Sequence, residues 1–290
     1  MKLCIATCQF PVSDNIRRNL GYVLLQMHRA KQRGAHVAHF PETCLSGYAG
    51  VDLDSHETMD WDQLIGTTHK ITKLAADLRL WVILGSSHRL TGRHKPHNSL
   101  YIINSQGRIV DRYDKRFCTG DRLCRGGDLA HYTPGRHFAV FEIRGVRCGV
   151  LICYDFRFDE LYRRYKQQGV QLMLHSYYNA GASAVALRRD NILGVIVAPT
   201  MQAYAANNYM WISASNSSRP ASCWASFFVR PDGRIVGRLI KNRSGVLINT
   251  VDPDMSFYDA SKNWRDRALK GVLHSGRLVQ DRRSQCRDRL

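Results

Sequence analysis

The sequence predicts an α/β fold with a mixed β-sheet, built as one large domain. Strand-like and helix-like segments alternate in the first part of the chain, whereas hairpin patterns dominate the middle and the end. No linker or change of composition interrupts residues 1–255, which we therefore expect to fold together. Residues 256–290 follow as a basic C-terminal extension, for which we expect a contact with another subunit.

Short runs of β-branched and aliphatic residues mark the strands, and apolar residues that recur every three or four positions mark the helices. Helices are expected at residues 15–33, 61–78 and 183–208 and from residue 156 onward, although Pro199 has to break or kink the third of these. Strands are expected at residues 3–7, 35–40, 81–86, 98–104, 108–113, 138–143, 146–152, 170–174, 210–214, 225–229, 235–238 and 246–251. Residues 118–135 form a long Gly-rich loop, a kind of segment that is usually functional or mobile.

The composition is that of an ordinary globular protein. The chain has 290 residues, of which 44% are hydrophobic and 23% charged. It contains nothing close to the roughly 18 consecutive apolar residues of a membrane span, and its first residues lack the pattern of a secretion signal. The nine cysteines are an odd number and are scattered, which favours free thiols over a disulfide framework. We therefore expect a cytoplasmic protein that does not bind a membrane.

The net charge of +18 raises the alternative of nucleic-acid binding. Much of that charge lies at the end, because residues 262–290 hold nine Lys or Arg and three Asp, a net +6. The sequence has no zinc-finger spacing, no aromatic RNA-binding signature and no Gly-rich phosphate loop. A solvated or subunit-contacting tail is therefore favoured over a nucleic-acid site.

Cys153 lies where an apolar strand pattern ends and a charged helical pattern begins, in the stretch GVLICYDFRFDELYRR. Backbone N–H groups that lack partners gather at such a junction, and they favour a thiolate and can hold an oxyanion. A buried structural cysteine is the alternative, and on this stretch alone it is favoured, because free cysteines are among the most buried residues.

Two charged residues stand at comparable places. Glu42 follows the strand that Pro41 terminates, in FPETCLSGY, and a carboxylate at the end of a buried strand is costly unless it has partners or a function. Lys115 follows the hairpin of residues 98–113, in YDKRF. Each could be an ordinary surface charge, but one mixed sheet could bring both to the same edge as Cys153, where they supply a base, a cation and a thiol.

These three stretches, in this order and spacing, resemble the glutamate, lysine and cysteine motifs of the nitrilase superfamily, the carbon–nitrogen hydrolases. The resemblance covers about residues 1–255. It implies an αββα sandwich of two mixed sheets with helices outside, which usually pairs with a second subunit through helix faces into a homodimer or a larger homo-oligomer.

The resemblance also implies roles for the residues. Cys153 would attack an amide carbonyl, and Glu42 would take the thiol proton and pass it to the leaving amine. Lys115 and the backbone N–H of Tyr154 would stabilise the oxyanion. No metal or organic cofactor is implied, and the histidines of the polar loop, His88, His94 and His97, lack partners at metal-ligand spacing.

The sequence departs from the family pattern at the second glutamate, which stands six residues before a Pro-Gly pair. Here Asp128 takes that place, so either the loop moves inward or the contact with the lysine passes through water. We expect Asp128 to belong to the catalytic group.

Residues around the expected pocket indicate the substrate class. Tyr48 is expected to line it next to Glu42, and the polar, aromatic side chains of His175, Ser176 and Tyr177 favour a small polar amide. The Cys-Tyr-Asp sequence resembles the aliphatic amidase and carbamoyl-amide branches, whereas nitrilases usually place Trp-Glu after the cysteine.

The predicted activity is therefore the hydrolysis of a small linear amide or N-carbamoyl compound through a thioester, with release of ammonia or an amine. The alternative is a catalytically silent basic protein of the same fold that binds nucleic acid through its tail. The joint presence of Glu42, Lys115 and Cys153 favours the enzyme.

Overall fold

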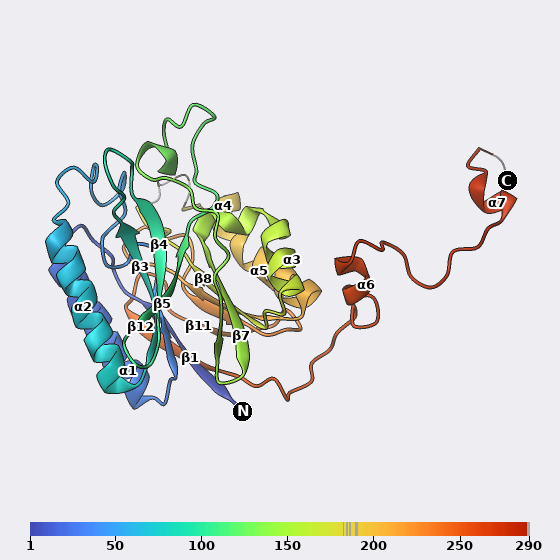
Figure 1. Cartoon of the computed structure of the whole chain (residues 1–290), viewed down its shortest axis with the longest axis horizontal. Coiled ribbons are helices and arrows are strands. Elements are labelled where there is room, and N and C mark those ends of the chain that lie inside the picture. The colour runs from blue at the N-terminus through green and yellow to red at the C-terminus, as the bar shows by residue number, and fades with distance from the viewer. Residues whose placement is uncertain (182, 184, 186, 189–190, 289–290) are drawn as a thin grey trace.

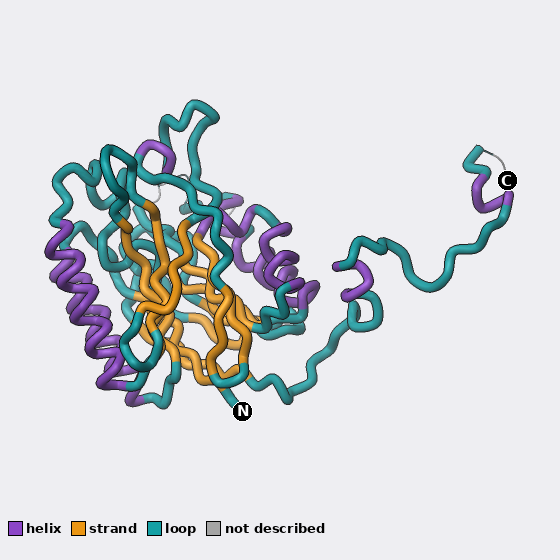
Figure 2. The backbone as a smooth tube through the Cα atoms, viewed as in Figure 1, coloured by secondary structure: helices purple, strands orange, loops and turns teal. Residues whose placement is uncertain are grey.

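Two six-stranded mixed sheets lie face to face in the computed structural model, and helices cover them on the outside (Figure 1). The structure describes residues 1–181, 183, 185, 187–188 and 191–288. This arrangement confirms the expected αββα sandwich. Figure 2 shows the strands gathered at the centre of the molecule, with the helices at its flanks and a long C-terminal segment outside it.

The first sheet contains the first and last strands of the domain. Its strands, in spatial order, are β12 (Gly245–Val251), β1 (Leu3–Gln9), β2 (Val37–His39), β3 (Trp81–His88), β4 (His97–Ile103) and β5 (Ile109–Asp114). The pairs β1–β2 and β2–β3 are parallel and the others antiparallel. β1 and β12 pair over their whole length, from Leu3 opposite Val251 to Gln9 opposite Gly245.

The second sheet is made of the six strands that lie between β5 and β12 in the sequence. In spatial order they are β11 (Ile235–Arg238), β10 (Phe227–Val229), β9 (Trp211–Ser215), β8 (Leu172–Ser176), β7 (Val146–Ile152) and β6 (Val140–Ile143). Here β7–β8 and β8–β9 are the parallel pairs. β5 and β7 therefore belong to different sheets, and no backbone ladder joins them.

Two long helices pack on the first sheet, and shorter ones lie beside the second. The helices are α1 (Ile16–Gln32), α2 (Trp61–Leu78), α3 (Asp159–Gln167), α4 (Ile192–Val195), α5 (Val197–Asn208), α6 (Arg265–Leu269) and α7 (Arg282–Gln285), with short 3₁₀ turns η1 (Asp128–Ala130) and η2 (Cys153–Arg157). Both long helices begin at a side-chain cap, because Asn15 accepts from the backbone N–H of Arg18 and Asp60 from that of Gln63.

The core forms two layers because strand side chains alternate between faces. In β1, Leu3 and Ile5 point into the layer between the sheets, whereas Ala6 and Cys8 pack under α1 and α2. The strands in the middle of the sheets are buried on both faces, so every residue of β2, β8 and β9 is buried, polar ones included.

A polar cluster crosses the layer between the sheets at His39, the last residue of β2. Its Nδ1 lies 2.9 Å from Ser213 Oγ in β9, and its Nε2 lies 2.9 Å from Ser176 Oγ in β8. Burial lowers the pKa of His39 to about 3, so the ring is neutral and bridges the two hydroxyl groups without charge. The cluster joins the strand that leads to Glu42 to the opposite sheet.

The helix predicted at residues 183–208 is divided in the structure, as Pro199 led us to expect, and its first helical residue is Ile192 in the described part of the chain. The structure has two helices there, α4 and α5, which divide at Ile196. Pro199 lies in the first turn of α5, where a proline is tolerated, and a continuous helix would have brought its ring against the carbonyl of Val195. Residues 184, 186, 189 and 190 of the predicted helix lie outside the described residues. No helix in the described part is long and apolar enough to cross a membrane.

Candidate active site

A cavity of about 490 Å³ lies where β2, β5 and β7 end. Lys115, Asp128 and Cys153 line it, together with the expected pocket residue Tyr48. Glu42 lies behind Lys115, in contact with its ammonium group and fully buried. The structure therefore brings the expected catalytic residues to one place, although they come from both sheets.

Close backbone packing holds the turn that carries Glu42. The backbone N–H of Glu42 donates to the carbonyl oxygen of Tyr177 at 3.2 Å. On the other side β3 passes so near that a side-chain carbon at Gly85 would lie 2.1 Å from the carbonyl oxygen of Pro41. Only glycine fits this approach, so Gly85 allows the turn to sit against the sheet.

The two carboxylate oxygens of Glu42 have different surroundings. Oε1 accepts hydrogen bonds from Lys115 Nζ and from Asn98 Nδ2, each at 2.8 Å. Oε2 is buried and has no hydrogen-bond partner among the described residues. Burial raises the pKa of Glu42, although the charge of Lys115 acts in the opposite direction. The carboxylate thus keeps one basic oxygen available.

Lys115 bridges two carboxylates. Its Nζ lies 2.8 Å from Glu42 Oε1 and 2.8 Å from Asp128 Oδ2, and it donates to the hydroxyl of Tyr48 at 3.2 Å. Burial alone would favour the neutral amine, but the charges of Glu42 and Asp128 outweigh it and raise the pKa of Lys115 well above its usual range. The side chain is therefore an ammonium ion in a site almost closed to solvent.

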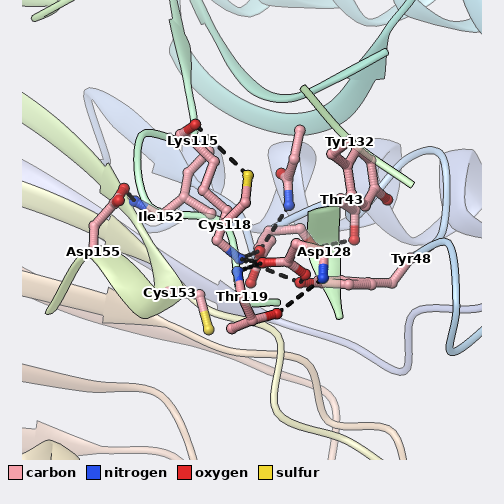
Figure 3. A network of polar contacts seen from close by, with 12 residues as sticks. Thr43, Tyr48, Lys115, Cys118, Thr119, Asp128, Tyr132, Ile152, Cys153 and Asp155 are labelled. Carbon is pink, nitrogen blue, oxygen red and sulfur yellow. Dashed lines mark hydrogen bonds and ion pairs between the residues drawn. The ribbon is translucent and has the colours of Figure 1, made fainter. Parts of the chain in front are cut away.

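Asp128 reaches Lys115 directly, without an intervening water (Figure 3). It lies at the start of η1 inside the long loop of residues 118–135. Its Oδ1 accepts from the Tyr48 hydroxyl, and its Oδ2 accepts from the backbone N–H of Thr119 at 3.0 Å. Burial disfavours the charge, yet Lys115 outweighs it and lowers the pKa of Asp128. Of the two expected arrangements, the structure has the direct contact with the lysine and not the water-mediated one.

Cys153 stands at the junction of β7 and η2 with a backbone φ of 39°, in the left-handed region that non-glycine residues rarely adopt. Its pKa is raised well above the usual value, chiefly by burial and then by the negative charge of Glu42, while Lys115 acts in the opposite direction. The thiol is therefore neutral at rest, and any attack by its sulfur requires a base. Tyr154, whose N–H is expected at the oxyanion, follows in the first turn of η2 and also lines the cavity.

The side chains of His175, Ser176 and Tyr177, expected to bind substrate, are fully buried and do not line the cavity. His175 Nε2 lies 3.1 Å from the carbonyl oxygen of Cys153, and burial lowers the pKa of this histidine to about 3. The Tyr177 hydroxyl donates to Sδ of Met201, a buried residue of α5. The expectation is wrong for these side chains because β8 extends to Ser176, so the loop that faces the cavity begins only at Tyr178.

A family model described as carbon-nitrogen hydrolase matches residues 4–257. The chain belongs to the carbon-nitrogen hydrolase family. This confirms the resemblance to the nitrilase superfamily that the three motifs carry.

Curated relatives of this carbon-nitrogen hydrolase are similar at about a quarter of positions. Nitrilase homolog 2 of Dictyostelium discoideum is 27% identical over 177 residues, which cover 59% of this chain and 52% of that protein. An omega-amidase of Xenopus tropicalis is 26% identical over 60% of this chain and 63% of its own length. These matches thus span less than two thirds of the two relatives. A 2-oxoglutaramate amidase of Bacillus subtilis is 26% identical over 81% of this chain and 86% of its own.

Solved structures of the same superfamily share the fold. An amidase from Nesterenkonia sp. superposes with a TM-score of 0.74 at 21% identity, covering 93% of this chain and 96% of that one. A mutant of the Nesterenkonia sp. AN1 amidase in complex with butyramide matches at a TM-score of 0.74 and 20% identity, covering 93% of this chain and 97% of that one. At this identity the likeness establishes the fold.

Sequence reasoning missed three residues of the site in this carbon-nitrogen hydrolase. Asn98, in β4, holds Glu42 Oε1, but nothing in the sequence distinguishes it from other polar strand residues. Tyr178 lines the cavity and packs on Tyr48, with ring centroids 4.9 Å apart. Arg157 also lines the cavity, and its place four residues after Cys153 could have indicated this. The described residues contain no group of three or more His, Cys, Asp or Glu arranged to hold a metal ion.

Proposed function

We propose that this protein is a cysteine-dependent amidohydrolase that cleaves the C–N bond of a small linear amide through a thioester acyl-enzyme. The observation that carries the proposal is the arrangement of Lys115 between Glu42 and Asp128 beside Cys153, in one cavity. A buried base, a fixed cation and a neutral thiol are what acyl transfer to sulfur requires.

The first half of the reaction forms the thioester. Glu42 takes the thiol proton of Cys153 as the sulfur attacks the amide carbonyl carbon, and the C–S bond forms. The carbonyl oxygen becomes an oxyanion, which the Lys115 ammonium and the Tyr154 N–H stabilise; removing one such donor typically costs about 10²–10³-fold in rate. The C–N bond then breaks, and protonated Glu42 gives its proton to the leaving nitrogen.

The second half hydrolyses the thioester. Glu42 takes a proton from water, whose oxygen attacks the thioester carbon, and the same oxyanion site stabilises the second tetrahedral intermediate. The C–S bond breaks, the carboxylic acid leaves, and the proton returns to Cys153. Atoms balance as amide plus water giving acid plus ammonia or an amine.

We propose an amide whose far end carries a carboxylate as the substrate. Relatives are named omega-amidase and 2-oxoglutaramate amidase, which points to amides of dicarboxylic acids. Arg157, an exposed cation in the cavity lining, offers such a carboxylate a charged partner. N-carbamoyl acids also combine a cleavable C–N bond with a carboxylate, so the test has to separate them from the amides of dicarboxylic acids. The Cys-Tyr-Asp sequence disfavours nitriles.

Ammonia release across ω-amides of dicarboxylic acids, N-carbamoyl acids, neutral aliphatic amides and nitriles tests the proposal. Mass spectrometry of a quenched reaction should show the acyl group on Cys153. Cys153→Ala and Cys153→Ser should release no ammonia, whereas Cys124→Ser, at an exposed loop cysteine, should behave as the wild type. A wild-type protein that releases nothing from the whole panel, with Cys153 unmodified, would overturn the proposal.

We also propose that two copies associate through the face of α3 and α5 and the C-terminal segment. α6 lies on that face, because Gln167 Nε2 of α3 donates to the carbonyl oxygen of Leu269 in α6 at 2.8 Å. A groove of about 360 Å³ lies between α6 on one side and α3 and α5 on the other. Beyond it the chain runs away from the body (Figure 1). There Leu273 is 79% and Leu278 74% exposed, so apolar surface is available to a partner.

We place the enzyme in the cytoplasm. None of the nine cysteines, all of which lie in the described part of the chain, forms a disulfide, and the reaction needs Cys153 reduced, which a reducing compartment ensures.

A further inference from the structure

We propose that Asp155 is the positioning residue that fixes the turn of Cys153 against the loop of Lys115. The inference rests on the proposed function and extends it to a residue that does not touch the substrate. The Asp155 side chain is fully buried and lies beside Ile152 (Figure 3). Its two oxygens accept three hydrogen bonds, and the donors come from both of the segments that have to be aligned.

One donor belongs to the segment of the nucleophile. The backbone N–H of Ile152, the residue directly before Cys153, donates to Asp155 Oδ2 at 3.0 Å. This bond closes the turn in which Cys153 takes its left-handed backbone conformation. That conformation is unfavourable for a residue with a side chain and persists only where the surroundings hold it.

Two donors belong to the segment of the lysine. The Tyr113 hydroxyl donates to Asp155 Oδ2 at 2.8 Å, and the backbone N–H of Phe117 donates to Oδ1 at 2.9 Å. These residues stand two positions before and two positions after Lys115. The carboxylate therefore binds the chain both before and after Lys115.

A side-chain bridge is needed because Lys115 and Cys153 follow strands of different sheets. β5 and β7 share no backbone ladder, so no regular hydrogen bonding sets the spacing between the two residues. Small errors in such a spacing are costly, since a misplacement of about 1 Å can lower a rate by about 10²-fold. Asp155 supplies the missing connection.

The residue type fits this role. An ionised carboxylate only accepts hydrogen bonds, and all three groups that meet it are donors. The titratable and charged groups that face it are Lys115 and Cys118 from the loop after β5, Tyr113 from β5, and Tyr162 and Tyr165 from α3. Burial raises the pKa of Asp155 to about 6, against the effect of its hydrogen bonds, so the group is ionised at neutral pH. An asparagine would turn an NH₂ group toward at least one of the donors.

Two variants and one control test the proposal. Asp155→Asn places an NH₂ group against at least one donor of the bridge, and Tyr113→Phe removes only the hydroxyl donor and keeps the ring. Asp159→Asn, an exposed carboxylate at the start of α3, is the matched control. We expect kcat to fall about 10²-fold in Asp155→Asn, with KM within about threefold of wild type, and to fall less in Tyr113→Phe.

The rate of Cys153 alkylation by iodoacetamide as a function of pH is the second readout, and it requires no amidase activity. Lys115 lowers the pKa of Cys153, so a lysine that is no longer held in place should shift the alkylation profile to higher pH in Asp155→Asn. A general loss of stability would not produce that shift in folded protein.

The outcomes separate the inference from the proposed function. A wild-type protein without amidase activity would refute the function, while a shifted alkylation profile would still support the bridge. Wild-type kcat and alkylation profiles in both variants would overturn the inference. If Asp155→Asn does not fold, Tyr113→Phe decides: unchanged kcat and alkylation overturn the proposal, and a lower kcat at constant KM supports it.

Discussion

Lys115 pairs with Glu42 through only one of the two carboxylate oxygens: its Nζ lies 2.8 Å from Oε1, while Oε2 has no partner among the described residues. Asn98 also donates to Oε1, which leaves that oxygen no further role. In the proposed reaction Oε2 is therefore the atom that takes the thiol proton. The lysine orients the base and at the same time keeps its own charge for the oxyanion.

Glu42→Gln removes this basic oxygen while keeping the shape of the side chain. We expect kcat/KM for amide hydrolysis to fall by about 10²–10⁴-fold, the usual contribution of a positioned base. Ammonia release measures the loss, and Glu57→Gln, at an exposed glutamate, is the matched control. Activity within about tenfold of wild type would show that another group takes the proton.

The site around Asp128 has the size of an aspartate, and a glutamate would be too long for it. Because Asp128 already contacts Lys115 Nζ, Tyr48 and Thr119, Asp128→Glu has to place an extra methylene in a buried network. We expect that variant to lose about 1–3 kcal/mol of unfolding free energy and also to lose activity. Asp128→Asn should keep the size and lose activity through the weaker hold on Lys115. Urea denaturation and kcat measure the two effects. An Asp128→Glu protein as stable and active as wild type would contradict the direct fit.

Arg157 should matter only to substrates with a carboxylate. Arg157→Ala is expected to raise KM for ω-amides of dicarboxylic acids by about tenfold or more, the worth of a charge-assisted hydrogen bond, and to leave neutral amides such as butyramide unchanged. Arg164→Ala, at an exposed arginine of α3, serves as the control. Equal losses for charged and neutral amides would mean that Arg157 acts on the fold of the cavity and not on the substrate.

Asp155 should give the stability a distinctive dependence on pH. Its pKa is about 6 in the folded protein against an ordinary value of 3.8, so the folded state binds its proton more tightly than the unfolded state does. The resulting stabilisation is complete below about pH 4 and is lost as pH rises through about 6, a change of about 3 kcal/mol. Urea unfolding of wild type and Asp155→Asn across this range should show the wild-type advantage shrinking with rising pH. A difference that stays constant, or grows, would contradict the raised pKa.

The C-terminal segment should affect assembly and not chemistry. Deleting residues 272–290 removes the exposed Leu273 and Leu278. We expect a smaller mass by light scattering at equal protein concentration, with kcat per chain unchanged. Binding to nucleic acid at low salt that disappears with the deletion would instead favour the alternative role of the tail. Unchanged mass and no such binding would leave the segment without either function.

The positions of site residues could be predicted from the sequence where those residues stand at the end of a strand. Lys115 and Cys153 directly follow β5 and β7, and Glu42 stands three residues after the end of β2. Buried strands are readable because their apolar runs are dense. For the same reason the long helices α1 and α2 were predicted almost to the residue, whereas the two mixed sheets were implied only by the resemblance to the nitrilase superfamily. Asp128 was found through the motif spacing, although its direct contact with Lys115 depends on the path of the loop.

The other contacts of the site depend on how the two sheets pack, and local sequence patterns do not encode this packing. Asn98 and Asp155 act on residues more than 30 positions away, across a sheet or between sheets. His175, Ser176 and Tyr177 were misassigned because β8 runs two residues further than its apolar pattern indicates, which turns these side chains into the core. Strand ends are the least certain feature of such a pattern, and a shift of two residues decides which side chains meet a ligand.

The pairing of β1 with β12 has a consequence for biosynthesis. β1 can pair with β2 soon after both have left the ribosome, but its other edge stays open until β12 has been made, more than 200 residues later. An open strand edge attracts the edges of other chains. Newly made protein therefore exposes this edge to aggregation until β12 has been made, and chains cut short before residue 245 would never close it.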